Sequence, residues 1–193
     1  MKNIITLFLT LTFFNGFAQS DYFWIGGTGN FSDTTHWATT SGGTILQTQV
    51  PTSLDNVYFD ANSFDAAGQT VTLDNNDLMC KNIDFSAVTN SPTFNGNSNT
   101  LLVYGSIDLV ETMSINAISF KLEATTAGHT LTSAGHTLGG LTFNGIGGEW
   151  ALQDELTSSS TFDLKHGSVI TNSYTLNINS FSSENSNVRT LTL

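Results

Sequence analysis

From Val57 to the last residue, apolar residues alternate with polar ones in short bursts, such as Leu141 and Phe143. Residues two positions apart lie on the same face of a β-strand, so each burst predicts a short strand with one buried face. Clusters such as DNND from Asp74 separate the bursts. Their side chains hydrogen-bond to nearby backbone and tolerate positive φ, which favours turns. The sequence therefore predicts an all-β fold.

A long internal repeat distinguishes between the all-β architectures. TLDNNDLMCKNIDF from Thr72 aligns without a gap with TLTSAGHTLGGLTF from Thr130. Three further matches follow in the same order: VYGSI at Val103 with KHGSV at Lys165, SFKLE at Ser119 with SFSSE at Ser180, and TLTS at Thr130 with TLTL at Thr190. All four spacings are about 60 residues, and a unit of that length with three strand segments implies stacked coils of about 20 residues.

We therefore expect a single-stranded parallel β-helix, or β-solenoid, with an N-terminal cap of aromatic residues and glycine. An antiparallel β-sandwich is the alternative, but a sandwich gives no reason for the repeat. About seven coils from Val57 onward, each about 4.8 Å high, predict a rod of about 34 Å. Its predicted core comprises Val71, Leu73, Ile83, Phe85, Leu101, Val103, Ile118, Phe120, Leu131, Leu141, Phe143, Leu164, Val169, Leu176 and Ile178.

The N-terminus has the pattern of a secretory signal peptide. Lys2 precedes an apolar run, and Gly16 and Ala18 supply the small residues before a cleavage site. The run is shorter than the roughly 20 residues that a membrane span requires. We therefore expect cleavage after Ala18, secretion or display at the cell surface, and no membrane insertion after cleavage.

The chain divides into a signal peptide (1–18), an N-terminal cap region (19–56) and the β-solenoid (57–193). The third repeat contains only its first segment, because TLTL at Thr190 ends at Leu193. The repeat is thus incomplete at the C-terminus. We expect the chain to be part of a longer protein. The remainder of that protein is then an expected interaction partner of this chain.

The charge balance excludes some classes of partner. Sixteen acidic residues stand against five basic ones, and the formal net charge is −11. Such a surface repels nucleic acid, so no nucleic-acid partner is expected. The single cysteine, Cys80, cannot form an internal disulfide and is expected to be a small buried residue.

Aromatic residues and glycines gather in YFWIGGTGNFSDTTHWATTSGG, which starts at Tyr22. Large apolar rings there could cover the exposed end of the first coil, while glycines turn the backbone tightly and polar side chains fix a turn. The residues expected in this structural cap are Trp24, Gly26, Gly27, Gly29, Asp33, His36 and Trp37. An aromatic platform that binds glycans is the alternative. The GGTG segment lacks the preceding strand and following helix of a nucleotide-binding loop.

With VPTSLDNVYFDANSF and VTLDNNDLMCKNIDF, this stretch resembles the N-terminal region of large secreted repeat proteins of Bacteroidetes-type bacteria. The resemblance covers Tyr22 to Phe85. The same stretch also resembles the signature that begins strand-repeat units of autotransporter adhesins. That signature consists of a tryptophan, an asparagine-tryptophan pair, a proline and an aspartate, and here His36 stands in place of the asparagine. The resemblance implies surface display and a β-helical stalk, often with a C-terminal sorting domain for type IX secretion. It implies no catalytic residues.

Two groups of residues could bind metal ions. Oxygen ligands for calcium occur at turns, at Asp55, Asp60, Asn62, Asp65, Asp74 and Asp77, but neither turn matches a complete calcium-loop consensus. Solvated turns are therefore favoured, and no cofactor is predicted. His129 and His136 recur in GHTLTSAGHTLGG without cysteine or glutamate at ligand spacing, which favours repeated turn positions over a metal site.

The function that these features favour is a noncatalytic structural or adhesive segment of a larger cell-surface protein, with glycans or surface proteins as partners. A carbohydrate-active β-helix enzyme is the rival, and it would need carboxylates with a base in one cleft. Its candidates are Asp108, Glu111, Asp154, Glu155, Asp163, Lys81, Lys121 and Lys165. A flat threonine face that binds ice or mineral is a further alternative, built from Thr130, Thr132, Thr137 and Thr142.

Overall fold

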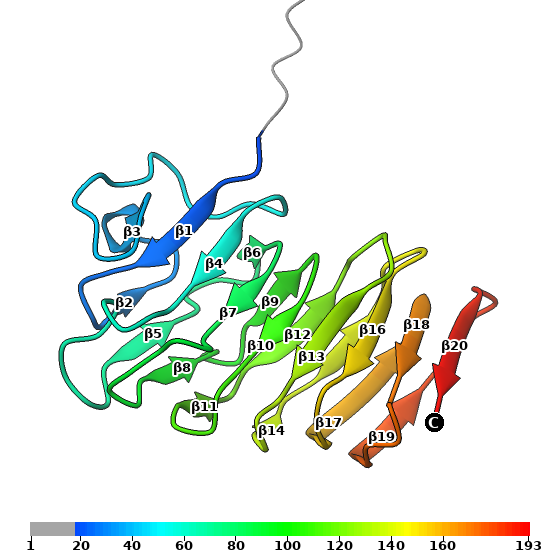
Figure 1. Cartoon of the computed structure of the whole chain (residues 1–193). Coiled ribbons are helices and arrows are strands. Elements are labelled where there is room, and N and C mark those ends of the chain that lie inside the picture. Colours follow the sequence, from blue (N-terminus) through cyan, green and yellow to red (C-terminus); the bar gives the residue numbers. More distant parts are fainter. Residues whose placement is uncertain (1–17) are drawn as a thin grey trace, which may run out of the picture.

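The computed structural model describes residues 18–193, and the predicted signal peptide up to residue 17 lies outside them (Figure 1). The described chain contains twenty strands, one 3-10 turn, η1 (Thr34–His36), and no α-helix. All strand pairs are parallel except β1 with β3. The predicted parallel β-solenoid is confirmed, and the antiparallel sandwich is wrong. Within these residues no helix is long and apolar enough to cross a membrane.

The strands form three sheets, which we call A, B and C. Sheet A contains, in spatial order, β3 (Trp37–Ala38), β1 (Asp21–Trp24), β4 (Asn56–Tyr58), β7 (Ile83–Asp84), β10 (Ile107–Asp108), β13 (His129–Thr132), β16 (Glu149–Leu152), β18 (Gly167–Ile170) and β20 (Arg189–Thr192). Sheet B contains β2 (Gly29–Asn30), β5 (Thr70–Thr72), β8 (Thr93–Asn95) and β11 (Ser114–Asn116). Sheet C contains β6 (Met79–Cys80), β9 (Thr100–Val103), β12 (Ser119–Leu122), β15 (Leu141–Phe143), β17 (Leu156–Leu164), β14 (Thr137–Leu138) and β19 (Leu176–Ser182).

The chain returns to sheet A once per coil, and its register there marks each coil. The paired positions are Val57 with Ile83, Ile83 with Ile107, Ile107 with Leu131, Leu131 with Leu152, Ala151 with Ile170, and Ile170 with Thr192. There are thus six coils after Val57 rather than seven, because the first three are longer than expected. The coil length falls along the rod from about 25 residues to about 20 residues. Six steps of about 4.8 Å make a rod of about 29 Å.

The sequence repeat has two structural meanings. The three later matches relate strands of the same sheet three coils apart, as in the sheet C series Phe120, Leu141, Phe162 and Phe181. The gapless match does not, because Thr72 lies on β5 of sheet B and Thr130 on β13 of sheet A. That match relates two similar strand-turn-strand units that begin on different sheets of the solenoid.

The coils shorten because the corner between sheets B and C disappears. Three consecutive corners between these sheets span residues 73–78, 96–99 and 117–118, and the corresponding corner of the following coil, between β14 and β15 of sheet C, spans residues 139–140. In the next coil β17 runs through the corner without a break, with a register shift between Ser158 and Thr161. The cross-section therefore changes from three faces near the blue end of Figure 1 to two faces near the red end.

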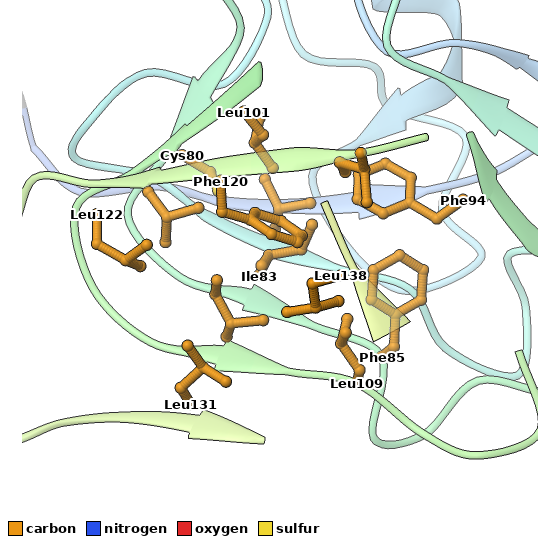
Figure 2. Close-up of a cluster of buried hydrophobic side chains, with 14 of the residues drawn as sticks. Cys80, Ile83, Phe85, Phe94, Leu101, Leu109, Phe120, Leu122, Leu131 and Leu138 are labelled. Atoms are coloured by element: carbon orange, nitrogen blue, oxygen red, sulfur yellow. The ribbon is translucent and has the colours of Figure 1, made fainter. Parts of the chain in front are cut away.

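Inward-facing side chains from all sheets meet in one core, as Figure 2 shows for Ile83 of sheet A, Phe94 of sheet B and Phe120 of sheet C. Thirteen of the fifteen predicted core residues are buried. The two exceptions, Leu176 and Ile178, are only half-buried because they lie on β19, beyond which sheet C has no strand. Cys80 is a free, buried thiol, and burial raises its pKa.

Candidate functional site

The two tryptophans of the N-terminal motif lie inside the molecule. Trp24 and Trp37 are both 0% exposed and form an edge-to-face pair with ring centroids 4.9 Å apart. Their indole N–H groups donate to the carbonyls of Gly27 and Phe31, at 2.7 and 2.9 Å. Both rings pack on Phe59 of the first full coil. They close the N-terminal end of the core, and in this conformation neither presents a face that could stack on a glycan.

His36 fixes the turn around this aromatic cluster. Its ring stacks on Trp24 at 4.6 Å, and its Nδ1 lies 2.6 Å from the carbonyl oxygen of Ile25. Gly29 lies against the same ring, because a Cβ there would approach the imidazole Nε2 to 2.2 Å. Gly26 and Gly27 adopt φ values of +79° and +72°, which favour glycine.

Asp33 begins the 3-10 turn η1. Its carboxylate accepts hydrogen bonds from the hydroxyl and the backbone N–H of Thr35, at 2.7 and 2.9 Å. These bonds favour the ionised form and hold the pKa of Asp33 below its ordinary value. The turn then leads through His36 into Trp37, so all seven residues expected in the cap lie in this cluster or its turns.

The carboxylates proposed as calcium ligands serve separate loops. Asp55 is buried and accepts hydrogen bonds from the backbone N–H groups of Ser20 and Thr52, both at 2.9 Å. The carboxylates of Asp60, Asp65 and Asp74 accept hydrogen bonds from the Asn62 N–H, the Gln69 side-chain amide and the Ser32 N–H, respectively. Asp77 is exposed, and its backbone N–H donates to Asn75. Among residues 18–193, no group of three His, Cys, Asp or Glu side chains could hold a metal ion.

The histidines of GHTLTSAGHTLGG also make local contacts. The Nε2 atom of His129 lies 3.1 Å from the Thr126 hydroxyl, and that of His136 lies 2.9 Å from the Val110 carbonyl.

The structure does not gather the residues that a glycosidase-like site would need. Lys121 pairs with Glu123, and Lys165 pairs with Asp163 at 3.2 Å. None of the three main hollows in the described surface contains more than one of the eight candidates.

The four threonines do not form the flat face that was the further alternative. Thr130 and Thr132 lie on β13, Thr137 on β14 and Thr142 on β15. These strands follow one another around a single coil, whereas a flat ladder needs the same position on successive coils. Threonine is a common strand residue at any register, so its abundance alone does not predict such a face.

A polar ladder on sheet A was not anticipated. The side-chain amide of Asn82 donates to the Oδ1 of Asn56 at 2.8 Å, and that of Asn56 donates to Asp21 at 2.9 Å. In the other direction, the Oδ1 of Asn82 accepts from the backbone N–H of Ser106 at 2.7 Å, and the Ser106 hydroxyl accepts from the N–H of Thr130 at 3.0 Å. We call these five residues the asparagine ladder.

Two of the three main hollows in the described surface lie in different parts of the rod. One, of about 400 Å³, lies among the turns near Ile146 and Val188. A smaller one, of about 230 Å³, lies on sheet A between Tyr58 and Asp108. Burial, and then the charges of Asp84 and Asp154, raise the pKa of Asp108.

The third hollow, of about 430 Å³, we call the Lys81–His129 hollow. Its lining is Gln19, Ser53, Leu54, Lys81, Tyr104, Ala124, Thr125, Thr126 and His129. No aspartate or glutamate lines it. No motif in the sequence indicates this hollow, because only the register of sheet A places Lys81 and His129 in one row.

Comparison with protein families found no matching model, and comparisons with curated proteins and with solved structures found no match.

Proposed function

We propose that this chain is a noncatalytic structural or adhesive segment of a larger, exported cell-surface repeat protein. The observation that carries the proposal is the difference between the two ends of the rod. At the N-terminal end Trp24 and Trp37 are fully buried, whereas at the other end Phe181 is 50% exposed and Leu176 is half-buried. A further coil stacked on β19 and β20 would bury these side chains and pair their backbone. The resemblance of Tyr22 to Phe85 to secreted repeat proteins supports the same proposal.

The structural part of the proposal can be tested by adding one coil. A second copy of residues 171–193 is appended after Leu193, and thermal unfolding is followed by circular dichroism. We expect a higher midpoint, by about 2–4 °C for each kcal/mol gained in a domain of this size. The matched control appends the same residues with proline at the copies of Asn177 and Thr190, which removes ladder donors. Equal midpoints for the two extended chains would contradict the proposal.

The location can be tested independently. The full chain, with its own N-terminus, is expressed in a Gram-negative host, and the mass of the exported product is measured. The expected product begins at Gln19. A product that keeps residues 1–18 and stays in the cytoplasm would overturn the proposed export.

A further inference from the structure

The register of sheet A creates the Lys81–His129 hollow. Ile83 pairs with Ile107 and Ile107 with Leu131, so Lys81, Gly105 and His129, two positions earlier, occupy one row on three successive coils. The two outer side chains are therefore about 10 Å apart along the rod. Between them Gly105 contributes no side chain. A Cβ on Gly105 would lie 2.2 Å from the Oδ1 of Asn82, so the asparagine ladder itself keeps this position open.

The hollow carries positive charge and hydrogen-bond donors on an otherwise acidic chain. Lys121 and Lys165 pair with carboxylates, but Lys81 forms no ion pair within the described residues, and its ammonium donates to the side-chain oxygen of Gln19 at 2.7 Å. The chain has a net charge of −11, yet no acidic side chain lines this hollow. An anionic group would find at Lys81 the one lysine in the described chain that is not neutralised.

Two carboxylates that adjoin lining residues in the sequence, Asp55 after Leu54 and Glu123 before Ala124, are engaged elsewhere. Asp55 receives the N–H groups of Ser20 and Thr52, and Glu123 receives Lys121 and the amide of Asn144. They are satisfied within the fold and leave the ammonium of Lys81 without a carboxylate partner.

Hydroxyl groups lie beside the row of Lys81, Gly105 and His129. Ser53, Thr125 and Thr126 line the hollow with Tyr104, and each hydroxyl can donate and accept. Tyr104 adds an aromatic ring, and Leu54, which is 43% exposed, adds an apolar contact. A cation, neutral donors and an aromatic ring together suit a ligand that carries an anionic group among hydroxyls. The volume of about 430 Å³ lies within the range of small-ligand sites, roughly 300–1,000 Å³.

We propose that the Lys81–His129 hollow binds an acidic saccharide, with the carboxylate or sulfate of the sugar between Lys81 and His129 and its hydroxyls on the threonine and serine rim. This proposal deepens the proposed adhesive function and rests on it for its biological meaning. The binding itself is a property of the purified chain and is measured without any assumption about export or stacking.

The test measures the binding of glucuronate to the full chain by isothermal titration calorimetry, beside glucose and inorganic sulfate. A dissociation constant of roughly 1 mM is expected for glucuronate, as for a ligand of this size with ordinary efficiency. Glucose should bind at least tenfold more weakly, because it lacks the charge. In Lys81→Met the affinity for glucuronate should fall at least tenfold, while in the matched control Lys165→Met, outside the hollow, it should stay within twofold.

Three results would overturn the proposal. Glucose binding as well as glucuronate would show that the anionic group is not recognised. Equal losses in Lys81→Met and Lys165→Met would show that only overall charge matters. Inorganic sulfate binding as tightly as glucuronate would show an anion site without a preference for a sugar. Circular dichroism of each variant confirms that it is folded, and none of these results bears on the appended-coil test of the stalk.

Discussion

The two parts of the rod share one strand pattern and an aromatic core but differ in cross-section and in how far their end strands are covered. Up to Thr132 the coils have three sheets, and large aromatic rings such as Trp37 and Phe59 fill the interior. From β14 onward sheet B is absent, the coils are shorter, and the last strands are half exposed. The alternation of residues determines the strands, but the corner loops determine the shape that the strands enclose.

The same contrast holds outside the core. The asparagine ladder joins Asp21, Asn56, Asn82, Ser106 and Thr130 along one row of sheet A. In the following coils this row continues as Ala151, Ile170 and Thr192, which lack such a series of side-chain bonds. We therefore expect stability to be concentrated in the N-terminal part.

The largest effect is expected for matched aromatic truncations at the two ends. Trp37→Ala removes a fully buried ring and an indole hydrogen bond, and should lower the free energy of unfolding by about 3–5 kcal/mol. Phe181→Ala removes a ring that is already 50% exposed, and should cost less than about 1 kcal/mol. Urea unfolding measures both. Similar losses in the two variants would contradict the proposed difference between the ends.

A smaller effect is expected for adding one methyl group. Gly29→Ala forces a Cβ against the His36 ring, 2.2 Å from its Nε2, and should cost about 1–3 kcal/mol. Gly140→Ala, at a corner of the C-terminal part, meets no atom closer than 3.3 Å and should change stability by about 0.5 kcal/mol or less.

The cause of the Gly29 effect can be isolated in a double variant. Combining Gly29→Ala with His36→Ala should cost little more than His36→Ala alone, because the clash is gone. Additive losses would mean that the methyl group clashes with something other than the imidazole.

The central residue of the asparagine ladder should contribute about 1–2 kcal/mol to the free energy of unfolding, because removing it breaks two hydrogen bonds. Asn82→Ala removes the acceptor of the Ser106 N–H and the donor to Asn56. Thr130 takes part through its backbone N–H, so Thr130→Val keeps the ladder bond and the β-branched shape, and should have a smaller effect. Thermal unfolding compares the stability of the two variants. An equal loss of stability in Thr130→Val would show that the hydrogen bonds of the ladder do not account for the effect of Asn82→Ala.

The smallest effect concerns pH. The pKa of Asp108 is raised in the fold, chiefly by burial and then by Asp84 and Asp154, so the folded state binds its proton more tightly than the unfolded state does. Asp108 therefore favours folding below its unfolded pKa, and this contribution is lost as the pH rises through the folded value. Asp108→Asn should raise the free energy of unfolding by about 0.5 kcal/mol or less at pH 7, because the carboxylate is only partly buried and water screens its charge.

This gain should vanish as the pH falls toward the unfolded pKa of the carboxyl group. The control Asp163→Asn removes the partner of Lys165 and should give no gain at either pH. Unfolding in urea at pH 7 and at low pH compares the variants, and a gain in Asp108→Asn that is independent of pH would rule out the carboxylate charge as its cause.

Structural features that depend on neighbouring residues could be predicted from the sequence, whereas features that depend on residues far apart in the chain could not. Alternation identified the strands and the burial of residues such as Ile83 and Phe143, because side-chain direction is local. The burial of Trp24 and Trp37 also followed from one short motif. The positions that share a row did not, since the register depends on the length of each corner. For that reason the sequence could not decide against the alternative of a flat threonine face, and it did not indicate the row of Lys81, Gly105 and His129.

The indole of Trp150 spans more than one coil. Its N–H donates to the carbonyl of Gly105 at 3.0 Å, although His129 of the intervening coil lies between them in the register. Coils of a solenoid otherwise contact mainly their neighbours, so a pull on the C-terminus detaches them one at a time. The first two coils to detach lack such a bond, and the third must break it. A molecule stretched by force should therefore yield easily over its last two coils and then require a higher force to unfold further.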